Sequence, residues 1–361
     1  MRKKIIIVII ILFVFIGGKA AINFAKFSPV LLGLLFHKDI ALKKTNEQIN
    51  ILLLGIGGGK HEGPNLSDSI IFASINPQKN TVSLISIPRD LWIPDLNAKI
   101  NTAYATGEEK RKGGGLLLSR AVVAKVLGQQ IDYGIRVDFD GFIKAVDLIG
   151  GIDVAVERTV DDYEYPIEGK ENDTCGHTDE DIPKLATSSS QLEAFPCRYM
   201  HIHFDKGQQH MDGITALRFV RSRHAKGVEG TDFARSNRQE KIIQGFKNRV
   251  LSIDTLLNPL KVISLFTTFS DNVDTDIPQS EIDDFVRLAD KMREATIRSA
   301  VLDYGDTTRS GLLVNPPISS DYRSAWVLIP RKGNGNFMEV REYVTCIIST
   351  GTCSITPSTK Q

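Results

Sequence analysis

Eight acidic and basic residues, in segments far apart along the chain, could together bind a metal–pyrophosphate group. They are Asp68, Arg89, Asp90, Arg221, Arg223, Asp232, Arg235 and Arg238. Carboxylates supply the oxygen ligands that Mg²⁺ prefers alongside water and substrate phosphates. Arginine presents a planar fork of N–H donors that matches phosphate oxygens. The alternative is a set of surface ion pairs, which is the usual role of charged residues.

The acidic pair at one end of a predicted β-hairpin favours the metal site. Strand-like segments at 69–75 and 81–87 are joined by an Asn-Pro-Gln-Lys-Asn turn. This turn places Asp68 almost opposite the residue before Arg89, with Asp90 about 7 Å further along the strand. We therefore expect Asp68, Arg89 and Asp90 to meet at one end of the sheet. There the two carboxylates could hold one hydrated Mg²⁺, and a strand-end ion pair is the alternative.

The other arginines fall near the junction of two predicted helices, at 212–222 and 231–250. Arg221 and Arg223 are two residues apart where the first helix ends, so an extended backbone would point both side chains the same way. Thr231 is a good N-cap for the second helix.

The first turns of the helix at 231–250 carry the remaining polar set. Asp232, Arg235 and Gln239 lie about one turn apart on one face, with Arg238 adjacent. A helix N-terminus also favours a bound anion. His224, just before this helix, is a candidate acid or base, although a single histidine is more often structural.

The overall charge argues against a nucleic-acid partner. The chain has 44 basic and 43 acidic residues, for a net charge of +1. Clustered arginines bind nucleic acid when the whole domain is basic and carries aromatic residues that stack on bases. Neither property is evident, so we predict no nucleic-acid partner.

The N-terminus predicts a signal-anchor transmembrane helix over residues 1–22. Three basic residues follow the initial methionine and precede an apolar run at 5–16. A basic flank of this kind leaves the N-terminus inside and the remainder of the chain outside the cell membrane. Residues 23–48 then read as a juxtamembrane stalk. A cleaved signal peptide, with a small-x-small site at 18–20, is the alternative.

Cysteine spacing agrees with an oxidising compartment. The four cysteines are Cys175, Cys197, Cys346 and Cys353. An even number in two close pairs predicts disulfides 175–197 and 346–353. A zinc site is the alternative, in which the first pair would be joined by His177, His201 and His203.

Strands and helices alternate through the middle of the chain, which indicates an α/β domain. Further strands are expected at 49–56, 133–137 and 152–156, and further helices at 115–127, 139–149, 254–268 and 279–295. The predicted domain covers 49–300 and contains a polar, disulfide-closed insertion at 158–203. A C-terminal extension, 301–361, carries strand-like AVLDYG (300–305) and SAWVLIP (324–330) and the small second disulfide loop.

Several blocks of the sequence resemble the LytR-CpsA-Psr family of bacterial envelope proteins. They are NILLLGIGGG, LSDSIIFASINPQKNTVSLISIPRDLWIP, KINTAYATGE, IDYGIRVDFDGFIKAVDLIGGIDVAV, MDGITALRFVRSRHA and DFARSNRQEKII. They occur in order between about residues 49 and 300, so the resemblance is specific.

The resemblance implies a central mixed β-sheet flanked by helices, with a hydrophobic pocket that accommodates a lipid. It implies an enzyme, a phosphotransferase assisted by Mg²⁺, that moves a glycopolymer from a polyprenyl-pyrophosphate carrier to peptidoglycan or another wall acceptor. The membrane would hold both the enzyme and the carrier. We expect the helices at 115–127 and 139–149 to line the lipid pocket.

Matching by motif carries the family's roles onto this chain. Asp68 and Asp90 resemble the metal ligands. The expected catalytic residues are Arg89, Asp90, Arg221, Arg223 and Asp232, and the expected pyrophosphate-binding residues are Arg89, Arg221, Arg223, Arg235, Arg238 and Gln239. Asp232 is our first choice for the base that removes the acceptor proton, and His224 is the second.

Two departures from the family pattern leave other functions open. Many members have an aspartate after the first strand, where this chain has only glycines, and an arginine where it has Leu66. A non-catalytic scaffold that binds polyprenyl phosphates is therefore a second hypothesis. A pyrophosphatase-like hydrolase acting through the same site is a third.

Overall fold

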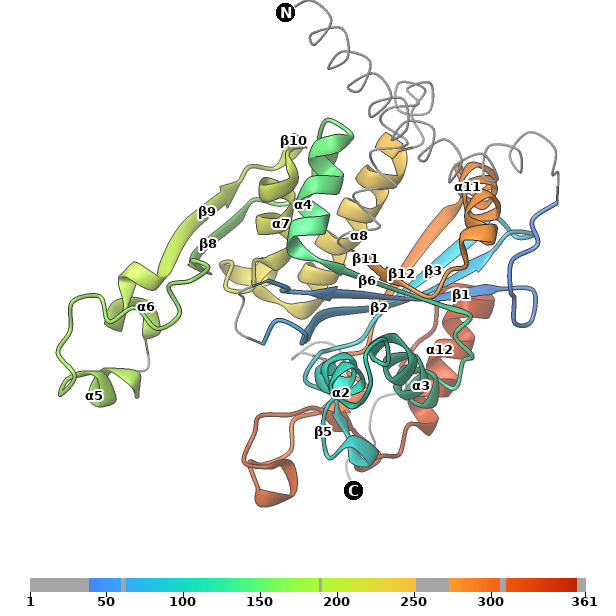
Figure 1. Ribbon diagram of the computed structural model, residues 1–361. Coiled ribbons are helices and arrows are strands. Elements are labelled where there is room, and N and C mark those ends of the chain that lie inside the picture. Colours follow the sequence, from blue (N-terminus) through green and yellow to red (C-terminus); the bar gives the residue numbers. More distant parts are fainter. Residues whose placement is uncertain (1–38, 60–62, 188–189, 251–272, 306–309, 356–361) are drawn as a thin grey trace, which may run out of the picture.

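The computed structural model describes residues 39–59, 63–187, 190–250, 273–305 and 310–355 (Figure 1). The predicted membrane helix at 1–22, most of the stalk and the predicted helix at 254–268 lie outside these residues. Among the residues that are described, no helix combines the length and apolar character needed to cross a bilayer. The described end of the predicted stalk packs on the domain, because Leu42 is buried against the core.

A mixed sheet forms the centre of the fold, as predicted (Figure 1). Its strand order is β11–β6–β1–β2–β3–β12. The strands are β1 (Ile49–Ile56), β2 (Ser67–Asn76), β3 (Thr81–Ser86), β6 (Tyr133–Asp138), β11 (Val273–Thr275) and β12 (Thr296–Val301). β2 lies between β1 and β3 and runs antiparallel to both, whereas β6 runs parallel to β1 and β12 parallel to β3. The predicted hairpin is β2–β3.

Helices cover both faces of this sheet (Figure 1). One face carries α2 (Ala103–Lys110), α3 (Gly115–Leu127) and α12 (Met338–Thr350), and the other carries α4 (Phe139–Leu148), α7 (Gly213–Arg221), α8 (Asp232–Val250) and α11 (Ile282–Lys291). Side chains alternate along a strand, so Leu52 and Leu54 of β1 face the first set of helices while Ile51 faces the second.

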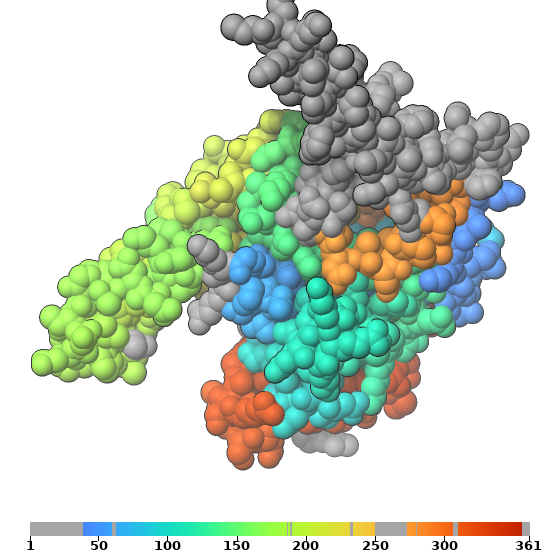
Figure 2. Space-filling view, viewed as in Figure 1, coloured from blue at the N-terminus to red at the C-terminus, as the bar shows by residue number. Residues whose placement is uncertain are grey.

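A two-stranded arm projects from the body (Figures 1 and 2). It consists of β8 (Val160–Pro166) paired with β9 (Tyr199–Phe204), with short helices α5 (Ile182–Ala186) and α6 (Gln191–Ala194) between them. The adjoining β7 (Ile152–Val156) and β10 (Gly207–Met211) form a second pair. The disulfide 175–197 joins two parts of the arm, as predicted. Both of its cysteines are consumed, so the alternative zinc site through them is wrong.

The C-terminal segment shares the core of the domain. Val340 and Val344 of α12 are buried in the same cluster as Val123 of α3. The predicted disulfide 346–353 is present at the end of α12. Of the strand-like SAWVLIP segment, only β14 (Ile329–Pro330) forms, pairing with β13 (Leu313–Val314). The short strands β4 (Trp92–Ile93) and β5 (Ala98–Lys99) lie beyond the hairpin and pair with each other.

Candidate active site

The hairpin brings Asp68, Arg89 and Asp90 together, as its sequence predicted. In the β2–β3 register Ile71 pairs with Ser86, and continuing that register places Asp68 across from Arg89, one residue beyond the predicted partner. Arg89 Nη1 lies 2.5 Å from Asp68 Oδ1, and Arg89 Nε lies 3.6 Å from Asp90 Oδ2. One guanidinium therefore bridges both carboxylates.

Lys99 is a member of this group that the sequence interpretation missed. Its Nζ lies 2.6 Å from Asp90 Oδ1. The pairing of Lys99 with Trp92 across β4 and β5 brings the ammonium back beside Asp90. Lys99 lies in the KINTAYATGE block, which resembles the family. That block could have drawn attention to Lys99, but nothing in it indicated that Lys99 pairs with Asp90.

Two observations fit an anion bound with a divalent cation here. Arg89 Nε is buried and, among the described residues, has no hydrogen-bond partner. A buried N–H without a partner is costly, and a phosphate oxygen would satisfy it. Asp68 and Asp90 flank this guanidinium, and Mg²⁺ in phosphate-binding sites is commonly held by one or two carboxylates plus water and phosphate. The residues present fit Mg²⁺, and Asp68 and Asp90 are the two that would hold it.

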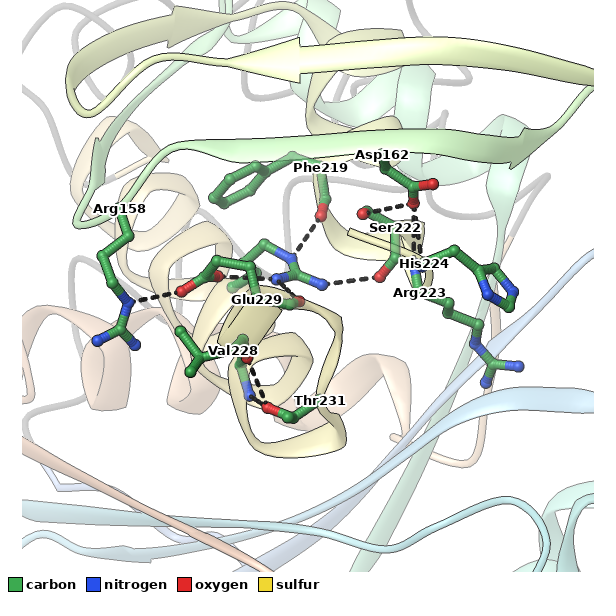
Figure 3. Close-up of polar contacts among 11 residues, drawn as sticks. Arg158, Asp162, Phe219, Ser222, Arg223, His224, Val228, Glu229 and Thr231 are labelled. Atoms are coloured by element: carbon green, nitrogen blue, oxygen red, sulfur yellow. Dashed lines mark hydrogen bonds and ion pairs between the residues drawn. The ribbon is translucent and has the colours of Figure 1, made fainter. Parts of the chain in front are cut away.

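A buried carboxylate on the arm orients the loop after α7. Asp162 of β8 has no exposed surface. Its Oδ2 accepts hydrogen bonds from Ser222 Oγ at 2.7 Å and from the backbone N–H groups of Arg223 and His224 at 3.2 Å each. Ser222 ends α7 (φ −52°, ψ 129°) and points its hydroxyl at Asp162, whereas Arg221 and Arg223 on either side of it line a cavity described below. Figure 3 shows the Arg223 and His224 side chains leading away from Asp162.

Arg221 lies on the other side of Ser222 and packs on aromatic rings. Its guanidinium carbon is 4.3 Å from the centre of the Phe139 ring and 5.8 Å from that of Tyr165. Burial raises the pKa of the Tyr165 phenol, and the positive charge of Arg221 opposes that shift. Cation–π contacts of this kind hold the guanidinium beside the two rings, at the wall of the site.

The start of α8 adds Arg235 and Gln239 to the site. The predicted N-cap is confirmed, because Thr231 Oγ1 accepts a hydrogen bond from Ala234 N at 3.1 Å. About two turns after the N-cap, Gln239 Nε2 donates to Ser69 Oγ at 3.0 Å, which ties the helix to β2. Asp232 is the first residue of α8, and its side chain lies outside the described part of the structure.

Arg238 does not join the other arginines, contrary to the sequence prediction. Its side chain is 3% exposed and donates to the backbone oxygens of Phe219 at 3.0 Å, Ser222 at 2.7 Å and Glu229 at 2.8 Å. Glu229 Oε2 accepts a further bond at 3.0 Å (Figure 3). Arg238 lies on the buried side of α8 and spends four of its five N–H donors on the loop between α7 and α8, which it holds in place.

Two neighbouring cavities receive these side chains. The larger, of about 580 Å³, is lined by charged and polar residues Asp68, Ser69, Arg89, Glu168, Glu171, Arg221, Arg223, His224, Arg235 and Gln239, and by Gly63, Leu66, Phe139, Pro166, Leu217 and Val220. The smaller, of about 340 Å³, is lined by Pro88, Arg89, Asp90, Arg223, His224, Gly230, Thr231, Arg235, Trp326 and Leu328. Arg89, Arg223 and Arg235 line both, together with His224.

The apolar part of the larger cavity differs from the predicted lipid pocket in one element. Phe139 of α4 contributes to it, as expected, but its helical partner is α7 through Leu217 and Val220. The predicted helix at 115–127 is α3, which packs on the opposite face of the sheet with α12. Leu66, the departure from the family pattern, adds a further apolar surface beside Gly63.

Comparisons with known proteins identify relatives of this chain. A model of the LytR_cpsA_psr family matches residues 28–318. TagU of Bacillus anthracis, named as a polyisoprenyl-teichoic acid–peptidoglycan teichoic acid transferase, is 30% identical over 243 residues, covering 66% of this chain and 64% of TagU. TagV of Bacillus subtilis, with the same named activity, is 28% identical over 252 residues, covering 68% of this chain and 53% of TagV. The chain therefore matches less than two thirds of the length of these relatives. The crystal structure of Bacillus subtilis TagV superposes with a TM-score of 0.54 at 25% identity, over 84% of this chain and 97% of that one.

Proposed function

Because the chain belongs to the LytR_cpsA_psr family, we propose that it is a phosphotransferase that moves a glycopolymer from a polyprenyl-pyrophosphate carrier to a cell-wall acceptor. The convergence of four arginines on one cavity with an apolar wall carries this proposal. A polyprenyl-pyrophosphate has the same two parts, an anionic head and a hydrocarbon tail. The names of the relatives TagU and TagV point to the same substrate class.

The larger cavity is the proposed donor site. Arg89, Arg221, Arg223 and Arg235 would bind the pyrophosphate oxygens, while Phe139, Leu217 and Val220 would pack along the first part of the lipid. Fixed cationic donors stabilise charge that develops on phosphate oxygens during transfer. Mg²⁺ held by Asp68 and Asp90 would add further neutralisation of that charge.

The smaller cavity is the proposed acceptor site. It shares Arg89, Arg223 and Arg235 with the donor cavity, so an acceptor there approaches the same phosphate from another side. Trp326, a residue that is 43% exposed, lines this cavity. An exposed indole beside polar groups suits the apolar face of a sugar ring.

The proposed reaction is a substitution at the phosphorus that bears the glycan. The acceptor hydroxyl oxygen forms a new P–O bond, the bond to the bridging oxygen breaks, and polyprenyl phosphate leaves with that oxygen. The hydroxyl proton passes to a base. Asp232 at the start of α8 and His224, which lines both cavities, are the two candidates.

We also propose that the enzyme is anchored by residues 1–22 and acts outside the cell membrane. The apolar N-terminal run with its basic flank supports the anchor. The two disulfides, 175–197 and 346–353, support an oxidising compartment.

Turnover of a polyprenyl-pyrophosphoryl sugar by the full chain, with Mg²⁺ and peptidoglycan fragments, tests the proposal. Released polyprenyl phosphate and acceptor-linked glycan are both quantified. We expect equal amounts from the wild type, neither from Arg89→Ala plus Asp90→Ala, and wild-type amounts from Arg293→Ala, whose side chain pairs with Asp290 on the surface. Polyprenyl phosphate without acceptor-linked product would identify a hydrolase. Donor binding without either product would identify a non-catalytic scaffold.

A further inference from the structure

Three potential metal ligands meet on the exposed side of the arm, apart from the two cavities. Asp161 of β8 pairs in register with His203 of β9, and His201 lies two residues earlier on the same side of that strand. Asp161 Oδ1 is 2.6 Å from His201 Nε2 and 3.1 Å from His203 Nδ1. The three ligand atoms all lie within 4.8 Å of one another.

The surroundings of this cluster resemble the outer shell of a metal site. His203 Nε2, the ring nitrogen that does not face Asp161, lies 3.2 Å from Asp205 Oδ1. Histidines that bind metals usually donate their other ring N–H to a carboxylate or carbonyl, which fixes the tautomer. The Tyr163 ring stacks on His201 with 4.0 Å between ring centres, which fixes that imidazole as well.

We propose that Asp161, His201 and His203 bind one divalent transition-metal ion of the Zn²⁺ class. Two imidazoles and one carboxylate form a common three-ligand set for Zn²⁺, with water in the fourth position. The same set is poor for Mg²⁺ and Ca²⁺, which require oxygen ligands. Two of the three histidines that the alternative zinc site assigned to the cysteines, His201 and His203, thus lie beside a carboxylate instead.

Lys226 competes with the ion for Asp161. Its Nζ lies 3.6 Å from Asp161 Oδ2 and 4.2 Å from the centre of the Tyr163 ring. Without the ion, this ammonium and the histidine hydrogen bonds satisfy the carboxylate. Like charges repel, so removing Lys226 strengthens binding of the metal.

Ion binding at Asp161 would also stiffen the strand that orients the active-site loop. The next residue, Asp162, points to the other side of β8 and holds Ser222, Arg223 and His224. Lys226 N donates to the backbone oxygen of Asp161 at 2.9 Å, which joins the loop to the strand directly. The metal site itself does not depend on the proposed transferase function.

Titration of the tag-free, chelator-treated full chain with ZnCl₂, in competition with a chromophoric chelator, tests the site. We expect one Zn²⁺ per chain, with affinity unaffected by millimolar MgCl₂. All four cysteines form disulfides, so no thiol competes for the ion. His201→Gln and His203→Gln each lower the affinity by at least about tenfold, the scale on which even outer-shell changes act. Lys226→Met raises it.

His210→Gln is the matched control. His210 is also exposed and paired with a carboxylate, Asp153 Oδ1 at 2.8 Å, but belongs to no three-ligand group among the described residues. We expect this variant to bind Zn²⁺ as the wild type does. The proposal is overturned if the wild type takes up no stoichiometric Zn²⁺, if His210→Gln weakens binding as much as His203→Gln, or if a folded His201→Gln/His203→Gln chain binds normally. A gain in Lys226→Met supports the site independently of those losses.

Discussion

Arg235 and Arg238 stand three residues apart on α8, and we expect the same substitution to affect activity at one and stability at the other. Arg235 lines both cavities, whereas Arg238 is 3% exposed beneath the loop between α7 and α8. Replacing either by methionine keeps much of the aliphatic stem and removes the guanidinium. We expect Arg238→Met to lower stability and Arg235→Met to lower turnover.

The hydrogen bonds of Arg238 set the size of the stability loss. Without its guanidinium, the backbone oxygens of Phe219, Ser222 and Glu229 lose a buried donor, and the Glu229 carboxylate loses one of its partners. Breaking a buried ion pair by removing one partner costs about 3–5 kcal/mol. Arg158 stays 2.8 Å from Glu229 Oε1 and compensates part of the charge. We therefore expect a loss of about 3 kcal/mol, near the lower end of that range.

Urea unfolding and a donor-binding assay distinguish the two effects. The unfolding midpoint should fall clearly for Arg238→Met, while the folded fraction of that variant still binds a polyprenyl-pyrophosphate analogue. Arg235→Met should unfold near the wild-type midpoint and bind the analogue weakly. Our assignment is refuted if Arg238→Met is as stable as the wild type yet loses donor binding, since its guanidinium would then serve the ligand.

Three further predictions concern the metal ions and the acceptor. Chelation of Mg²⁺ should lower transferase turnover. The double variant Asp68→Asn plus Asp90→Asn should retain only a low rate, and a titration of rate against MgCl₂ should show no response to added Mg²⁺. Trp326→Ala should raise the KM for the glycan acceptor and leave donor binding unchanged, whereas Trp326→Phe should keep a KM for the acceptor close to that of the wild type. Equal KM values in the wild type and both variants would contradict the acceptor site. Zn²⁺ affinity should fall as the pH is lowered, because hydrogen bonds to Asp161 and Asp205 raise the pKa of His203, and the ion must displace the proton. That decline should begin above the ordinary imidazole value of about 6.5, and an affinity that does not change with pH would exclude His203 as a ligand.

Local signals in the sequence predicted much of the site. The short hairpin fixed the register that brings Arg89 to Asp68, because few residues separate the two strands. The spacing of Arg221 and Arg223 around an extended Ser222 likewise predicted that both face one cavity. Both placements depend on residues close together in sequence, so side-chain periodicity and turn-forming residues were enough to predict them.

Features that depend on tertiary packing were not predictable in the same way. Arg238 looked equivalent to Arg235 in sequence, and only the loop that folds over α8 gives it three carbonyl partners and a carboxylate. The meeting of Asp161 with His201 depends on strands 40 residues apart. Lys99 reaches the site because β5 pairs with β4, and Trp326 reaches it because Leu328 bonds to the backbone of Asp90. Neither contact could be predicted from the residues next to Lys99 or Trp326 in sequence.

The C-terminal segment contributes to the smaller cavity from beyond the region that the family model matches. The family match ends at residue 318, yet Leu328 N donates to the Asp90 backbone oxygen at 2.9 Å, and Trp92 N donates to the Leu328 backbone oxygen at 2.8 Å. These bonds hold Trp326 at the mouth of the smaller cavity. Under the proposed function, substitutions after residue 318 would change which glycan is admitted without altering the arginines that would hold the carrier. Exchanging this segment between relatives would be a direct way to redirect the enzyme to a new acceptor.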